Sequence, residues 1–156
     1  MDGLGAAASV IAVIELTAKL ISLCLEYSSA VKNAKADIKR LRNYTEILKM
    51  TAEDAQKLLQ DPHGPRLKLS QKVDKALVDI RSQLNEINTT LEAKLGKGQK
   101  LMRRIGFRAL KWPFESKDMD KIIANLKRGQ DSFTAALQID QTYVQIRTSN
   151  SNLSDL

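Results

Sequence analysis

The sequence predicts an all-α protein, folded as an antiparallel four-helix bundle with an additional short basic helix before the last long helix. Aromatic residues make up only 4% of its 156 residues, and it has 7 Gly and 3 Pro, a composition that favours helix over sheet. Apolar residues recur with helical spacing over four long stretches, which short connections separate. We therefore expect one bundle over residues 1–147 and a disordered, Ser- and Asn-rich tail over residues 148–156.

The first helix, expected over about residues 4–31, is the most apolar part of the chain. Gly3 to Ile14 carries no charge, and the apolar run continues past only Glu15 and Lys19. About 22 residues at roughly 1.5 Å each extend roughly 33 Å, enough to cross a hydrocarbon core. A helix that is apolar almost all round is also typical of the buried centre of a bundle, and both interpretations stay open. The residues expected to insert into a membrane are Leu4, Val10, Ile11, Val13, Ile14, Leu16, Leu20, Ile21 and Leu25. Six of them are expected to be hidden in the resting bundle: Val10, Ile11, Val13, Ile14, Ile21 and Leu25.

Two further features of this helix concern its surface. Glu15 and Lys19 lie four residues apart with the acid first, so they face one another on a helix and can form an ion pair. Alternatively, a ring of Glu15 carboxylates from several protomers could line a cation path. The small residues Gly5, Ala8 and Ala12 form a stripe that lets another backbone approach closely, and we expect oligomerisation to use it.

The next two helices have simpler patterns. An amphipathic helix is expected over about residues 34–60, and the two prolines and the glycine of residues 61–65 end it. The third helix, over about residues 70–95, has the cleanest pattern, and Gly96 and Gly98 are expected to end it. Its apolar residues fall at two heptad positions: Val73, Ile80 and Ile87 at one, and Leu77, Leu84 and Leu91 at the other.

A basic segment follows, expected as a short helix over about residues 99–111. The formal net charge of the chain is +7, and the stretch from Gly96 to Trp112 contains six cations and no acid. Each Lys or Arg near an anionic lipid surface contributes about 1 kcal/mol, so we expect this segment to bind anionic membrane lipids. Trp112 would be its interfacial anchor; the alternative is a solvated charged face with Trp112 packed in the core. The expected lipid-binding residues are Lys97, Lys100, Arg103, Arg104, Arg108, Lys111 and Trp112.

The last long helix is expected over about residues 116–147, with Ser116 as its N-terminal cap. Catalytic and metal-binding residues are scarce. The only histidine, His63, lies in a turn between prolines, and the only cysteine, Cys24, lies in the apolar first helix. We therefore expect no metal site, no cofactor and no enzyme activity, and a cytoplasmic location. A nucleic-acid partner is not expected, because the basic segment lacks interleaved aromatic residues.

Two stretches resemble one protein family. MDGLGAAASVIAVIEL, at Met1–Leu16, closely resembles the start of fungal HeLo-like domains, the N-terminal domains of fungal STAND (NLR-like) receptors. GQKLMRRIGFRALKWP, at Gly98–Pro113, is similar to the basic segment before the last helix of that family. The spacing and the helical layout between them agree, so the resemblance covers about residues 1–145.

The resemblance implies a cell-death execution domain, similar to the four-helix domain of the mixed-lineage kinase-like pseudokinase of necroptosis. In that family an upstream NLR-like receptor or an amyloid-type signal makes the domain form a homo-oligomer, move from the cytoplasm to the plasma membrane and permeabilise it. This sequence departs from the family in that it holds no nucleotide-binding domain and its tail is too short for the usual amyloid motif, so we expect either an excised domain or a trigger outside this sequence. A non-lytic oligomerisation or partner-docking module is the alternative function.

Overall fold

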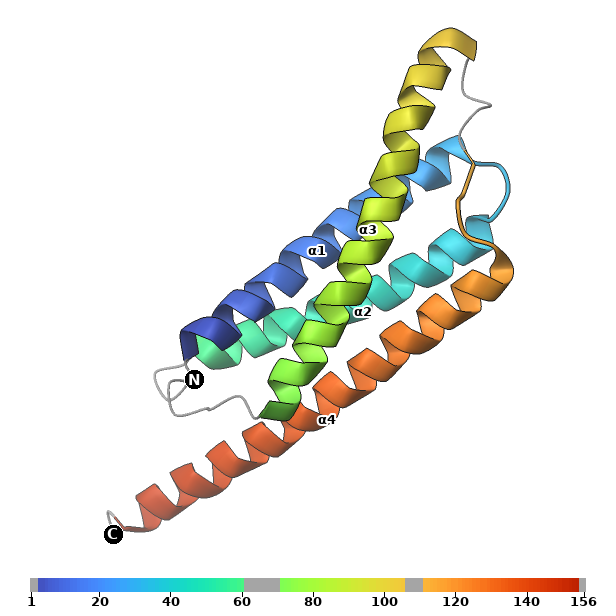
Figure 1. Ribbon diagram of the computed structural model, residues 1–156. Helices are drawn as coiled ribbons and strands as arrows, with labels where there is room; N and C mark the ends of the chain where they lie inside the picture. Colours follow the sequence, from blue (N-terminus) through green and yellow to red (C-terminus); the bar gives the residue numbers. More distant parts are fainter. Residues whose placement is uncertain (1–2, 61–70, 106–110, 155–156) are drawn as a thin grey trace.

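Over the residues that the computed structural model describes, the chain forms four long helices. These residues are 3–60, 71–105 and 111–154, with side chains described for residues 5, 7–60, 73–96 and 111–138. The helices are α1 (Gly3–Ala30), α2 (Lys35–Gln60), α3 (Gln71–Ile105) and α4 (Ser116–Ser154). Each runs opposite to the one before it, so the predicted antiparallel four-helix bundle is confirmed (Figure 1).

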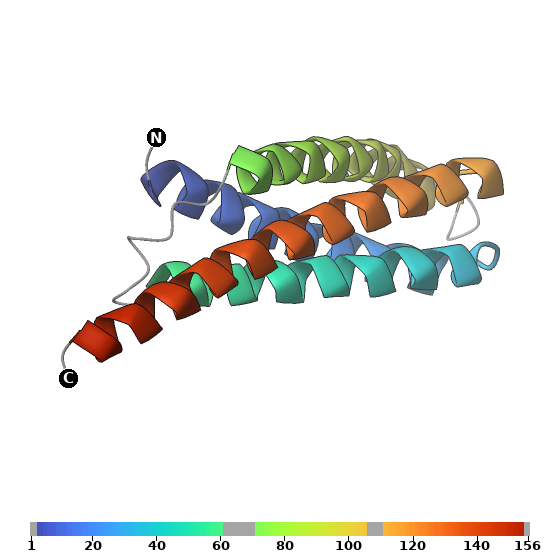
Figure 2. The same ribbon diagram turned by 90° about the horizontal axis from the view of Figure 1, so that it is seen from below.

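Consecutive helices are not always neighbours in this bundle. α1 packs against α2 and α3, and α4 packs against α3 and α2, so α1 and α4 lie diagonally opposite one another, as do α2 and α3. The view from below shows α3 along the upper side of the bundle and α2 along the lower side, with the C-terminal part of α4 extending below α2 (Figure 2). Because α1 has only two close neighbours among the described helices, a broad part of its surface faces outward.

One apolar core fills the bundle. The predicted heptad residues of α3 all point into it, and each is at most 5% exposed: Val73, Leu77, Ile80, Leu84, Ile87 and Leu91. α4 contributes the buried side chains Met119, Ile123, Leu126, Phe133 and Leu137. The apolar periodicity of both helices therefore identified the core correctly.

The two later helices are longer than predicted. α3 continues through both glycines to Ile105, so the basic segment begins as the last turns of α3, and the expected separate helix over residues 99–111 is wrong. A methyl group at Gly96 would meet nothing within 4 Å, and glycine in a helix costs only about 1 kcal/mol relative to alanine, too little to end this one. Residues 111–115 are not helical, and residues 106–110 lie outside the described residues.

The tail also differs from its prediction. α4 runs to Ser154, where a disordered segment from residue 148 was expected. Once a helix is nucleated, each further residue adds a backbone hydrogen bond, which offsets the weak helix propensity of Ser and Asn. In both views the C-terminal part of α4 extends beyond the other helices (Figures 1 and 2).

Candidate functional site

The inner face of α1 belongs to the core of the bundle. Val10, Val13 and Leu20 are at most 1% exposed, and Tyr27 is fully buried beside them. Cys24, the only cysteine of the chain, is fully buried in the same cluster. Three of the predicted membrane-inserting residues are therefore hidden in the bundle, which confirms the expectation for Val10 and Val13.

The outer face of α1 is apolar as well. Ile11 is 43% exposed and Leu25 is 52% exposed, so the expectation that the bundle hides these two residues is wrong. Ile14, Leu16 and Ile21 are half-buried, and the side chain of Leu4 lies outside the described residues. The only charged residues of α1 are Glu15, Lys19 and Glu26, and all three are exposed.

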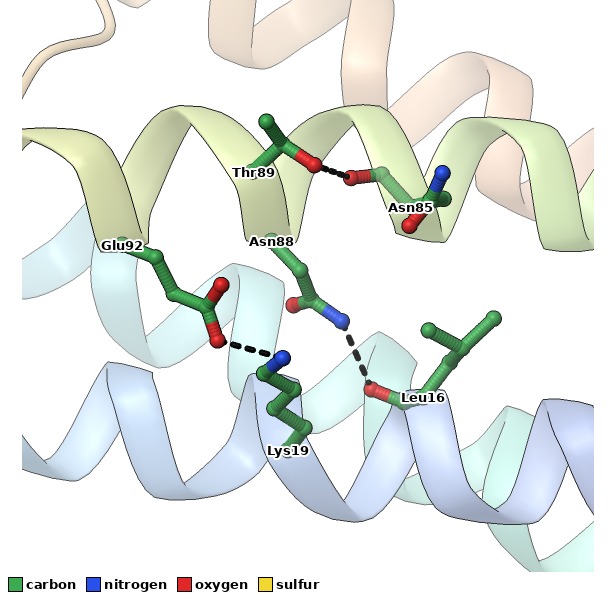
Figure 3. A network of polar contacts seen from close by, with 6 residues as sticks. All are labelled: Leu16, Lys19, Asn85, Asn88, Thr89 and Glu92. Atoms are coloured by element: carbon green, nitrogen blue, oxygen red, sulfur yellow. Dashed lines mark hydrogen bonds and ion pairs between the residues drawn. The ribbon is translucent and has the colours of Figure 1, made fainter.

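Side chains of α3 make polar contacts with α1. The Asn88 amide, only 1% exposed, donates through Nδ2 to the Leu16 carbonyl oxygen over 3.1 Å. One turn further on, Lys19 Nζ lies 2.5 Å from Glu92 Oε1 (Figure 3). Asn88 Oδ1 is buried and has no hydrogen-bond partner among the described residues, which costs about 1–3 kcal/mol. The α1–α3 interface thus contains polar contacts as well as apolar ones, and one of its polar side chains keeps an unpaired buried oxygen.

A third polar contact lies near the C-terminal end of α1. The Tyr27 hydroxyl donates to the Leu91 carbonyl oxygen over 2.7 Å, inside the core. The Tyr27 ring also meets Trp112 edge-on, with centroids 5.2 Å apart. Three polar contacts therefore join α1 to α3: Asn88 with Leu16, Lys19 with Glu92, and Tyr27 with Leu91.

The prediction of an ion pair between Glu15 and Lys19 within α1 is wrong. Lys19 pairs with Glu92 across the helix interface, and Glu15 has no ion pair among the described residues. The residue spacing within α1 could not reveal that a carboxylate of α3 lies beside Lys19. Both partners are about half exposed, so this ion pair contributes at most about 1 kcal/mol.

Glu15 instead lines an open groove between α1 and α3. The groove has a volume of about 660 Å³, and the α3 side of it includes the exposed residues Val78 and Arg81. The small-residue stripe runs toward this groove: Ala12 lines it half-buried, while Gly5 and Ala8 are exposed. A methyl group at Gly5 would meet nothing within 4 Å, so this end of the stripe packs against no described part of the chain.

The predicted lipid-binding residues are only partly described. Lys111 is exposed, and Trp112 is half-buried, with its ring against Tyr27 and, at 5.4 Å between centroids, against Phe114. Trp112 therefore packs on the core, which was the alternative interpretation. Lys97, Lys100, Arg103 and Arg104 lie in α3 with side chains outside the described residues, and Arg108 lies wholly outside them.

Comparison with known protein families, with characterised proteins and with solved structures finds no match to this chain. Among the described residues, one helix is long and apolar enough to cross a membrane, at Ala7–Ala30, and a third of that stretch is buried in the bundle. Core helices of soluble proteins also meet this criterion. The α1 helix, with its contacts to α3, is the candidate functional site.

Sequence reasoning missed the partners of α1. Asn88 follows the heptad residue Ile87, and an amide placed beside an apolar seam is the only sequence signal of an interhelix hydrogen bond there. Nothing in the spacing indicates that Glu92 faces Lys19, or that the Tyr27 hydroxyl reaches a carbonyl 64 residues away.

Proposed function

We propose that this chain is a HeLo-like cell-death execution domain of a fungal NLR-like incompatibility system, which permeabilises membranes when α1 leaves the bundle. The observation that carries the proposal is the two-sided apolar character of α1. Its inner face contributes Val10 and Leu20 to the core, and its outer face leaves Ile11 and Leu25 open to water. A helix that serves only as a bundle member usually keeps a polar outer face.

The length of α1 suits a membrane. The 24 residues of Ala7–Ala30 extend about 36 Å at 1.5 Å per residue, against about 30 Å for a hydrocarbon core. All backbone groups of a helix are satisfied internally, as a lipid environment requires. Glu15 and Lys19 would each cost about 2.5–3.5 kcal/mol near the bilayer centre. When α1 leaves the bundle, Lys19 loses its ion pair with Glu92. Lys19 can then pair with Glu15, which lies four residues before it on the same helix.

Release of α1 also exposes the core faces of α2 and α3. Each large apolar side chain uncovered in this way costs about 1.5–3 kcal/mol, so the bundle needs a replacement for α1. Homo-oligomerisation supplies one, because several copies can cover the exposed faces together. In the stripe of Gly5, Ala8 and Ala12 the first two residues are exposed and open to a second copy, while Ala12 is half-buried beside the groove. In such an assembly the Glu15 carboxylates could line a cation path.

The basic segment would bring the domain from the cytoplasm to an anionic plasma membrane, on a signal from an upstream NLR-like receptor or an amyloid partner. Lys111 is exposed and open to lipid headgroups. Trp112 contributes to the core in the resting bundle, so its role as an interfacial anchor would require the segment to move.

Leakage of dye from phosphatidylserine-containing vesicles tests this proposal. The double variant Ile11→Glu/Leu25→Glu places carboxylates on two exposed positions of α1, so the bundle stays folded while insertion is opposed. The matched control is Ile47→Glu/Met50→Glu, at positions of α2 that are 46% and 65% exposed. We expect the α1 variant to lose leakage and the α2 variant to keep it. Equal leakage from wild type and the α1 variant would contradict insertion.

A non-lytic oligomerisation or docking module is the second candidate function. It is favoured by the full burial of Val10, Leu20 and Tyr27, which joins α1 to the common core. Hydrogen exchange separates the two candidates. Insertion requires the backbone amides of α1 to exchange faster than those of the buried α3 heptads. If α1 never leaves the bundle, the amides of both helices should exchange equally slowly.

A further inference from the structure

We infer that a pocket at the end of the bundle binds a phosphate group. This pocket lies where α1 ends, α2 begins and residues 111–115 lead into α4 (Figure 1). It has a volume of about 910 Å³, within the usual size range of ligand sites. Its walls are the α1–α2 connection, residues 29–35, and three residues of the segment before α4: Lys111, Trp112 and Phe114.

The charge of the pocket is of one sign. Lys32, Lys35 and Lys111 line it, all three are exposed, and no carboxylate is among its lining residues. The nearest acid along α2, Asp37, has its carboxylate 3.6 Å from the Arg40 guanidinium and is thus partly neutralised. Three ammonium groups on residues that line one pocket favour an anion with several oxygens, because a phosphate group can accept hydrogen bonds from more than one of them.

Aromatic and apolar side chains also line the pocket. Trp112 and Phe114 form an aromatic pair there, with Val31 buried beside the pocket. Trp112 Nε1 has no acceptor among the described residues, but it is buried, so a ligand oxygen would reach it only after a local rearrangement. The first backbone N–H groups of α2, which starts at Lys35, have no acceptor within the helix and add partial positive charge.

The turn that carries these residues has a defined shape. Ala34 has a φ of 72°, unusual for a residue with a side chain, and its carbonyl oxygen accepts the hydrogen bond of the Ile38 N–H over 3.0 Å. This conformation directs the chain from α1 straight into α2 and keeps Lys32 and Lys35 on the same pocket. Residues 31–34 are the covalent connection between α1 and α2, so a phosphate held here would lie beside the point about which α1 would turn on leaving the bundle.

The ligand is a phosphate group, carried either by a soluble molecule or by a lipid headgroup. Trp112 is the only tryptophan of the chain and lines the pocket, so its fluorescence reports binding directly. The full-length chain is titrated with pyrophosphate, and separately with vesicles of phosphatidylcholine alone or with added phosphatidic acid. Calorimetry with pyrophosphate detects binding that leaves the fluorescence unchanged.

The pocket variant is Lys32→Gln/Lys35→Gln/Lys111→Gln. Its control is Lys57→Gln/Lys75→Gln/Lys127→Gln, which removes the same charge from three exposed lysines away from the pocket. We expect saturable pyrophosphate binding that weakens by about tenfold or more in the pocket variant and by less than about twofold in the control. Absence of saturable binding, or equal weakening in both variants, would overturn the inference.

The vesicle titrations distinguish the sources of the phosphate. Binding to phosphatidic acid vesicles that pyrophosphate displaces identifies a lipid headgroup, whereas pyrophosphate binding without vesicle binding identifies a soluble ligand. The inference does not rest on the proposed membrane activity. A chain that binds pyrophosphate but causes no leakage keeps the pocket and loses the proposed function, and a chain that leaks without binding pyrophosphate does the reverse.

Discussion

Replacement of Asn88 by leucine should stabilise the bundle and hinder the release of α1. The substitution removes the hydrogen bond to the Leu16 carbonyl, worth about 1 kcal/mol, but that carbonyl keeps its hydrogen bond within α1. It also removes the buried Oδ1, which has no partner among the described residues and costs about 1–3 kcal/mol. The net expectation is a gain of about 1 kcal/mol.

Thermal unfolding followed by circular dichroism measures this change. For a chain of this size, 1 kcal/mol corresponds to a rise in Tm of roughly 2–4 °C. If leakage requires α1 to leave α3, the same free energy should slow leakage about fivefold. Asn88→Ala is the control, because it loses the same hydrogen bond but leaves a cavity, and it should be about 2–5 kcal/mol less stable than Asn88→Leu. A leucine variant less stable than wild type by more than about 1 kcal/mol would refute the reasoning.

Three further predictions concern the stability of the helices and their packing. Tyr27→Phe removes the hydrogen bond to the Leu91 carbonyl and should lower the free energy of unfolding by about 1 kcal/mol in urea denaturation; an unchanged midpoint would show that this contact contributes nothing. Gly96→Ala should raise stability by about 0.5–1 kcal/mol, because the new methyl group meets open space. Gly129→Ala should not, because its methyl group would lie 2.9 Å from Cγ1 of the buried Ile80, and a stabilised Gly129 variant would contradict this packing.

The fold was predictable from the sequence because apolar periodicity directly reports which face of a helix is buried. Ile80 and Leu84 follow the heptad pattern and are fully buried, as predicted. Glycine was a weaker guide. Gly96 was expected to end α3, but the small preference against glycine in a helix is outweighed when the flanking residues form helix well.

For α1, the sequence predicted the burial of the inner face but not the exposure of the outer face. Val10 and Val13 are buried as expected, whereas Ile11 and Leu25 are exposed, because an almost uniformly apolar helix carries no pattern that tells its two faces apart. Partner choice was equally hidden from the sequence. Lys19 has one acid four residues away in α1, and it pairs with another that only the packing of α3 brings near.

The central claim is that α1 itself enters the lipid, and a fluorophore on its exposed face measures this directly. An environment-sensitive probe is attached to Leu25→Cys in a Cys24→Ala background, and to Met50→Cys on α2 in the same background as the control; both native side chains are more than half exposed in the bundle. On addition of anionic vesicles, we expect the probe at position 25 to brighten and shift to the blue while the probe at position 50 stays unchanged. Unchanged emission at both positions, or the same shift at both, would contradict the account.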